Sequence, residues 1–115
     1  MTDLNTVNII GRIANEPDLS KTSNGISQIL LTIANNREYS QNNEKVNEVN
    51  YFKIRLYGSM AENLSSYLKK GKQIAISGRL HQYSYDNSQT GFKISVTEII
   101  AHQIQFLGKK KIITD

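Results

Sequence analysis

Tyrosine and basic side chains alternate with apolar ones along two segments of the chain. Residues 51–57 read Tyr-Phe-Lys-Ile-Arg-Leu-Tyr, and residues 79–85 read Arg-Leu-His-Gln-Tyr-Ser-Tyr. Side chains on a strand point to opposite faces with period two, so each segment, if extended, gathers its rings and cations on one face. A ring stacks on a nucleobase while Lys or Arg pairs with a phosphate, so the pattern suits an unpaired nucleic-acid strand.

The spacing of these side chains favours single strands over duplex. Alternate residues of a strand lie roughly 6.6 Å apart, which is about one stretched nucleotide. Duplex DNA hides the faces of its bases, whereas a single strand exposes them. Exposed Tyr and Lys are also ordinary on sheets, but their recurrence on two segments favours a binding face.

The remaining apolar pattern predicts further strands. Period-two alternation indicates strands at 7–13, 28–35, 49–57, 73–85 and 92–107, the last bulged near 98–100. Turns are expected at 15–18, at Asn24-Gly25 and at 87–91. The polar residues 37–48 show no period, and we expect them to form a long exposed hairpin loop.

One helix is expected between the third and fourth strands. Ser59 and Glu62 fit a capping box, apolar residues follow at helical spacing, and Gly71 is placed to end the helix. The resulting order is β-β-β-α-β-β. It predicts an all-β fold with one short helix, a five-stranded antiparallel Greek-key barrel of the OB type. Residues 1–108 would form this domain, and residues 109–115 a short basic extension.

Composition limits the classes of function. The 115 residues include no cysteine, so a disulfide, a thiolate metal site and a thiol nucleophile are excluded. No apolar run is long enough to cross a membrane, and the first six residues lack the basic start of a secretory signal, so we expect a cytoplasmic protein. Residues 1–52 hold four basic and six acidic side chains and residues 53–115 hold ten and four, giving net charges of −2 and +6. The basic half is the one that carries most of the alternating face.

Catalytic and metal-binding motifs are weak. His81 and His102 lie on separate predicted strands, without an acid at ligand spacing, and we expect them to be surface or packed side chains. The segment before Gln73 does not match the motif of a phosphate-binding loop. Glu16 and Asp18 flank a proline in a turn, so we expect them to serve the turn and not to form a catalytic pair. We expect neither an enzyme nor a metal site.

A series of short motifs runs along nearly the whole chain, from about Val7 to Gly108. They comprise Ile10-Gly11-Arg12-Ile13, Glu16-Pro17-Asp18, Ile33-Ala34-Asn35-Asn36-Arg37, residues 57–62, residues 67–71, residues 76–80, Tyr83-Ser84-Tyr85 and Gly91. In this order and spacing they resemble the bacterial single-stranded DNA-binding protein (SSB) family, in a short form without the acidic C-terminal tail.

The resemblance implies an OB fold, usually a homotetramer, that coats single-stranded DNA during replication, recombination and repair, without a cofactor. It implies stacking by Tyr51, Tyr57 and Tyr85 and phosphate contacts by Lys53, Lys69, Lys70 and Lys72. The alternating face adds Tyr83 as a stacking candidate and Arg55 and Arg79 as phosphate candidates. An exposed edge strand invites pairing with a second chain, and the family dimerises through its first strand, so Val7, Asn8, Ile9 and Ile10 are the expected subunit interface.

This sequence departs from the family's pattern at three places. In the family, an aromatic side chain that follows the second strand stacks on a base. Its position aligns with Arg37 here, and Tyr39 lies two residues further on. This stacking contact is therefore either replaced by a charged side chain or moved to Tyr39. Other stacking positions, which often hold Trp in the family, hold Tyr in this sequence. Because the ring of Tyr has less area than that of Trp, we expect weaker binding per base. The family's acidic tail is not found after Lys109-Lys110-Lys111, so partner proteins recruited through such a tail are not expected.

Three other functions remain open from the sequence. A dimeric primosome-type accessory protein would have the same fold and bind a helicase loader as well. An OB module for protein assembly would use the aromatic face without nucleic acid. An RNA-binding barrel of cold-shock type is less consistent, because such barrels are shorter and lack the helix.

Overall fold

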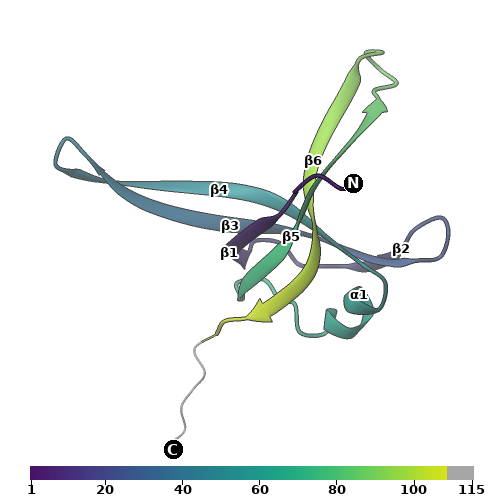
Figure 1. The fold of residues 1–115 in the computed structure, drawn as a ribbon, viewed down its shortest axis with the longest axis horizontal. Helices are drawn as coiled ribbons and strands as arrows, with labels where there is room; N and C mark the ends of the chain where they lie inside the picture. Colours follow the sequence, from purple (N-terminus) through teal and green to yellow (C-terminus); the bar gives the residue numbers. More distant parts are fainter. Residues whose placement is uncertain (109–115) are drawn as a thin grey trace, which may run out of the picture.

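The computed structural model describes residues 1–108, which form one barrel with two long hairpins (Figure 1). The extension predicted at 109–115 lies outside the described residues. In chain order the elements are β1 (Val7–Ile13), β2 (Leu19–Lys21), β3 (Ser27–Gln41), β4 (Glu44–Tyr57), α1 (Gly58–Leu64), β5 (Gln73–Asp86) and β6 (Lys93–Phe106).

The sheet closes on itself through β1. The strand order is β1-β5-β6-β4-β3-β2, and β1 also pairs with β3 at Arg12–Ala34 and Ile13–Ile33. The pairings are antiparallel except for a short parallel contact of β4 with β6, at Ile54–Ile99 and Arg55–Ile100. This five-stranded barrel with one helix between β4 and β5 is an OB fold, and the predicted fold class is confirmed. The three-residue β2, which pairs with β3, is an addition that the apolar pattern did not predict.

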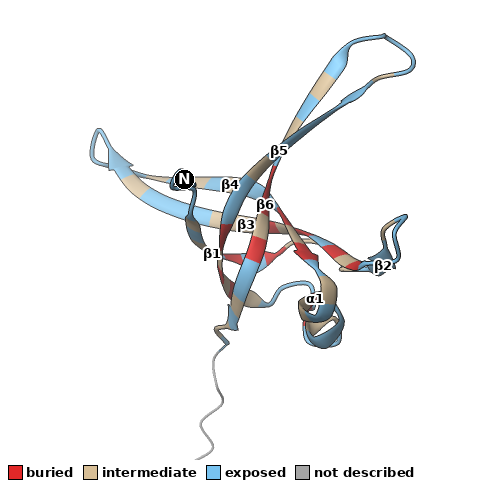
Figure 2. Cartoon of the chain, turned by 45° about the vertical axis from the view of Figure 1, so that its right-hand side comes forward, coloured by how far each residue is buried: buried red, intermediate tan, exposed pale blue. Residues whose placement is uncertain are grey.

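Period-two alternation places the core inside the barrel. Ile29, Leu31 and Ile33 of β3 are fully buried, as are the alternate residues Ile54 and Leu56 of β4. Ile74 and Ile76 of β5 complete the wall, and Ala61 and Leu68 cover one end. Buried residues gather in the barrel, whereas the hairpins that project from it are mostly exposed (Figure 2).

The prediction of a loop at 37–48 is wrong. β3 and β4 stay paired out to Gln41–Glu44 and form an arm (residues 36–49) that projects far from the barrel. Asn42 and Asn43 make the connection with φ of 54° and 65°, which suits the tight turns that favour asparagine. Both faces of this arm meet solvent, so its sequence lacks the apolar period that identifies a half-buried strand.

The second arm (residues 80–99) is made by β5 and β6 and diverges from the first. Where β4 and β6 separate, a cavity of about 620 Å³ opens between Tyr51–Lys53 and residues 95–99. Phe52 and Leu80 line this cavity and remain partly exposed. Both residues belong to the apolar sides of the two alternating segments, and the divergence of the arms explains why they are not buried.

The helix is shorter than predicted and is not capped as predicted. It covers Gly58–Leu64, and Tyr57 precedes it without any side-chain cap hydrogen bond. The carboxylate of Glu62 instead accepts a 2.6 Å hydrogen bond from the hydroxyl of Ser27 on β3. Glu62 therefore attaches the helix to the barrel. Gly71 takes a left-handed conformation (φ 91°) within a later turn, which is closed by a hydrogen bond from the amide of Lys72 to the carbonyl of Lys69.

The bulge of β6 lies beside Gly78 and not at 98–100. Ser77 pairs with Gln103 and Gly78 with Ala101, so His102 is the extra residue. A Cβ atom on Gly78 would overlap the carbonyl oxygen of Ile100. The bulge thus depends on the close approach of two backbones that only glycine allows.

Gly78→Ala should therefore destabilise the barrel. We expect the free energy of unfolding, from urea titration at fixed protein concentration, to fall by about 1–3 kcal/mol. Gly108→Ala is the control, because a Cβ atom there meets nothing within 4 Å. Equal stability of the two variants would contradict the close packing at the bulge.

Candidate nucleic-acid interface

The outer face of β4 carries the first alternating segment. Tyr51 is 65% exposed, and Lys53 and Tyr57 are also exposed, whereas Arg55 is half-buried. The residues of β3 paired with Tyr51 and Lys53 are Ala34 and Thr32. These small neighbours leave the larger side chains of β4 free to meet a ligand.

The outer face of β5 carries the second segment. Tyr83 and Tyr85 are exposed on the β5–β6 arm, and the ring of His81 stacks beside that of Tyr83 with centroids 6.1 Å apart. Arg79 lies on the same side of the strand and is exposed. In the sheet, β6 stands between β4 and β5, so the two segments flank one strand on the outside of the barrel.

A buried carboxylate joins the two segments. Glu98 of β6 is only 2% exposed. Its Oε1 and Oε2 atoms accept hydrogen bonds of 3.1 and 3.0 Å from Nε of Arg55. Nδ1 of His81 lies 3.5 Å from the same carboxylate, and the guanidinium of Arg55 also donates to Gln28 at 3.0 Å. Glu98 is not among the site residues predicted from the sequence. The available signal was its position, since Glu98 alternates with Val96 and Ile100 where strand periodicity would place an apolar side chain.

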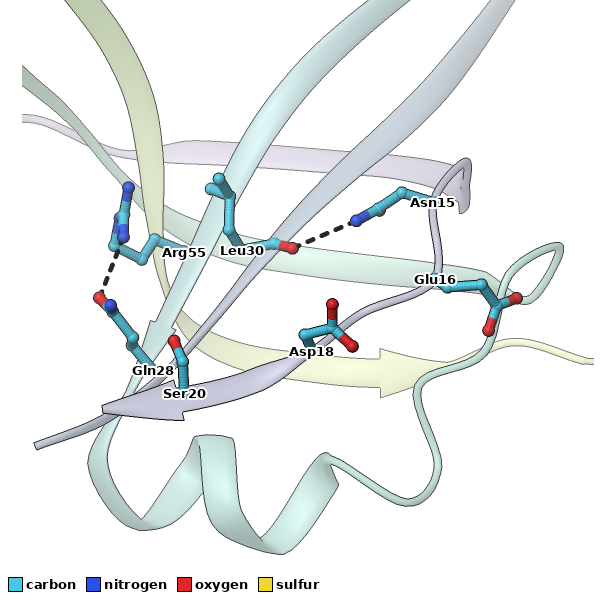
Figure 3. A pocket seen from close by; sticks show the side chains of 7 residues that line it. All are labelled: Asn15, Glu16, Asp18, Ser20, Gln28, Leu30 and Arg55. Carbon is cyan, nitrogen blue, oxygen red and sulfur yellow. Dashed lines mark hydrogen bonds between the residues drawn. The ribbon is translucent and has the colours of Figure 1, made fainter. Parts of the chain in front are cut away.

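The ion pair changes the role expected for Arg55. Its side chain is 17% exposed and its charge is already balanced by Glu98. It also borders a cavity of about 300 Å³ whose lining includes Glu16 and Asp18 (Figure 3). Negative charge beside Arg55 disfavours a phosphate there, so the exposed Lys53 and Arg79 are the stronger phosphate candidates of the two segments.

Arg37 and Tyr39 lie apart from this face. Both have odd numbers on β3, so the register of the β3–β4 arm places them on the opposite side of the ribbon from Tyr51. Arg37 lies 4.6 Å from the ring centroid of Tyr39 and 3.3 Å from a carboxylate oxygen of Glu48. The structure thus brings Arg37 and Tyr39 together but not with the other tyrosines.

The lysines after the helix form a separate basic patch. Lys69, Lys70 and Lys72 are exposed near the start of β5, and Nζ of Lys72 lies 5.5 Å from the ring centroid of Phe106. Tyr85 lies twelve positions after Gln73 on β5, which is roughly 40 Å of strand. A ligand that contacts both places must therefore run along the length of the molecule.

The first strand has a free edge. β1 pairs with β5 from Val7 to Arg12, but in the described structure it pairs with β3 only at Arg12 and Ile13. Asn8 and Ile10 are exposed, while Val7 and Ile9 turn toward the barrel interior and are half-buried. A side-chain amide, that of Asn35, reaches the carbonyl of Ile10 at 2.8 Å. Most of this edge can therefore accept a further strand.

Two other features bear on function. No helix within residues 1–108 has the length and apolar character required to span a bilayer. In the same residues, no three His, Cys, Asp or Glu side chains gather in a way that could hold a metal ion.

The fold and this face together define an OB barrel of the class that binds single-stranded nucleic acids. The sequence profile of the Single-strand binding protein family matches residues 4–107. This chain belongs to that family.

Individual relatives agree with the family assignment. The single-stranded DNA-binding protein of Borreliella burgdorferi is 36% identical over 108 residues, covering 94% of this chain and 72% of that protein. That of Halalkalibacterium halodurans is 38% identical over 104 residues, covering 90% of this chain and 61% of that protein. Among solved structures, the Plasmodium falciparum SSB complex with ssDNA matches with a TM-score of 0.83 and 26% identity, over 94% of this chain and 98% of that one.

Proposed function

We propose that this protein binds single-stranded DNA without sequence preference and protects it during replication, recombination and repair. The observation that carries the proposal is the pair of tyrosine-bearing strands, β4 and β5, on the outside of an SSB-family barrel. Bases stack on Tyr51, Tyr57, Tyr83 and Tyr85, while exposed cations track the phosphates. The proposed activity is binding alone, without a catalytic step, by a cytoplasmic protein associated with the nucleoid.

The burial of each side chain refines the roles. Lys53 and Arg79 contact phosphates beside the tyrosines. The phosphate contacts at the far end of β5 come from Lys69, Lys70 and Lys72. Arg55 is primarily a positioning residue, because Glu98 already balances its charge. Arg37 and Tyr39 contact only DNA that passes over the other side of the β3–β4 arm. Residues 1–108 are the proposed binding unit.

Self-association belongs to the same proposal. The free edge of β1, at Val7, Asn8, Ile9 and Ile10, pairs with that of a second copy to form a dimer, and two such dimers associate into a homotetramer. Light scattering at known concentration measures the mass directly. A stable dimer that binds DNA equally well would instead favour the primosome-type accessory protein.

Intrinsic tyrosine fluorescence tests the function. Titration with oligo-dT should quench it strongly, titration with duplex DNA should have little effect, and high salt should reverse the binding. Oligo-U tests whether the sugar matters. No response to oligo-dT below tens of micromolar would contradict the proposal and favour an OB module for protein assembly.

Salt dependence measures the number of phosphate contacts. If five cations per protomer (Lys53, Lys69, Lys70, Lys72 and Arg79) each neutralise one phosphate, the slope of log K against log salt should be about −3.5, or −0.7 for each contact. Lys53→Gln should make the slope less negative by about 0.7. Lys21→Gln, on β2, is the control and should leave the slope unchanged; an equal change in both variants would argue against a local contact at Lys53.

A further inference from the structure

Phe92 at the tip of the β5–β6 arm is the most exposed aromatic ring in residues 1–108. It is 73% exposed, more than Tyr51 or Tyr85. A phenyl ring is wholly apolar, and the rings of Tyr83 and Tyr85 on the same arm are exposed as well. The ring is therefore available to a ligand.

The backbone that carries Phe92 is well anchored. Its carbonyl accepts a 2.9 Å hydrogen bond from the amide of Asn87, and its own amide donates to the hydroxyl of Thr90 at 3.2 Å. The side-chain oxygen of Asn87 accepts from the amides of Gln89 and Thr90, and Gly91 takes φ of 77°. These bonds close the turn and hold Phe92 opposite Asn87 at the end of the ladder.

The register aligns Phe92 with two of the stacking tyrosines. Tyr85 pairs with Ile94 and Tyr83 with Val96. Phe92 precedes Ile94 by two residues, so strand alternation places its ring on the side of Tyr83 and Tyr85. Diagonal neighbours on one face of an antiparallel pair lie about 7–8 Å apart, so Phe92 lies roughly one stretched nucleotide from Tyr85.

The charges at the tip of the arm lie on its other side. Asp86 pairs with Lys93, and both alternate with the residues that share the face of Phe92. The face formed by Tyr83, Tyr85, Phe92, Ile94 and Val96 has no formal charge. Such a face suits the flat surface of a base and not a phosphate.

We propose that Phe92 forms an additional stacking subsite next to Tyr85, which takes one further unpaired base of the DNA, beyond the base on Tyr85, at the tip of the β5–β6 arm. The proposal rests on the proposed function and extends the binding face beyond the barrel. The subsite binds by stacking alone, so it adds affinity without adding salt dependence.

A tryptophan reporter tests the subsite directly. The sequence contains no tryptophan, so Phe92→Trp gives a protein with a single indole at the subsite. Its fluorescence should be strongly quenched by saturating oligo-dT. Ile26→Trp, an exposed site in the turn between β2 and β3, is the matched control and should respond little.

Affinity provides the second readout. Phe92→Ala should weaken binding of oligo-dT by about 5- to 150-fold, the equivalent of one lost stack, with the salt slope unchanged. Phe92→Trp should bind at least as well as the wild-type protein.

The outcomes separate the two proposals. If the wild-type protein does not bind oligo-dT, the proposed function itself fails. If it binds but Phe92→Ala is unaffected, or the indole of Phe92→Trp responds no more than that of Ile26→Trp, only the subsite is overturned. A shift of the indole emission of Phe92→Trp with protein concentration in the absence of DNA would overturn the subsite in favour of a contact between copies of the chain.

Discussion

Replacing Tyr51 and Tyr85 together with alanine should weaken binding of single-stranded DNA by about 2–6 kcal/mol, since each stacked base contributes about 1–3 kcal/mol. The two rings lie on different strands that flank β6, so each is expected to stack on its own base and the two losses should add. Both rings are exposed, and their removal takes little from the core. Titration with labelled oligo-dT at fixed salt measures the change.

A third exposed tyrosine provides the control. Tyr67 follows α1, with its ring centroid 6.3 Å from that of Phe106, and lies outside the alternating segments. Tyr67→Ala should bind oligo-dT nearly as well as the wild-type protein. If this variant loses as much affinity as the double variant, or the double variant loses none, stacking on the outer faces of β4 and β5 is wrong.

Glu98→Ala should have the largest effect on stability, lowering the free energy of unfolding by about 3–5 kcal/mol. The carboxylate is buried and binds Nε of Arg55 through both oxygens. Its removal leaves a guanidinium that is only 17% exposed without its partner charge. It also releases the link between β4 and β6 beside their short parallel contact, where the two arms separate.

A surface pair makes the matched comparison. Glu48 binds Arg37 on the exposed β3–β4 arm, and Glu48→Ala should cost at most about 1 kcal/mol. Replacing both members of the buried pair, as Arg55→Met with Glu98→Leu, should restore much of the stability, because such exchanges are often neutral. Equal losses in Glu98→Ala and Glu48→Ala, measured by urea unfolding, would contradict a structural role for the buried pair.

The barrel could be predicted from the sequence because one side of each barrel strand is buried. Alternation at Ile29, Leu31 and Ile33, and again at Ile54 and Leu56, identifies strands and their inward faces without knowledge of their partners. The arms could not be predicted in the same way. Residues 37–48 are held by strand pairing alone, and a polar ladder exposed on both sides has no periodic signature.

The exposed side chains of the candidate site could also be predicted, but their partners could not. Period two identified Tyr51, Lys53, Tyr83 and Tyr85 as outward-facing. It could not show that Glu98 lies beside Arg55, since that contact depends on a parallel pairing between strands more than forty residues apart. The side of the β3–β4 arm on which Arg37 lies depends on the register of the two strands. It could not be predicted, because these residues were expected to form a loop.

Photochemical crosslinking tests the central claim most directly. Oligo-dT containing 5-iodouracil is bound to the protein and irradiated, and mass spectrometry identifies the crosslinked residues. The account predicts crosslinks at the tyrosines of residues 51–57 and 83–85. Crosslinks confined to Tyr67, an exposed tyrosine outside these two segments, would contradict it.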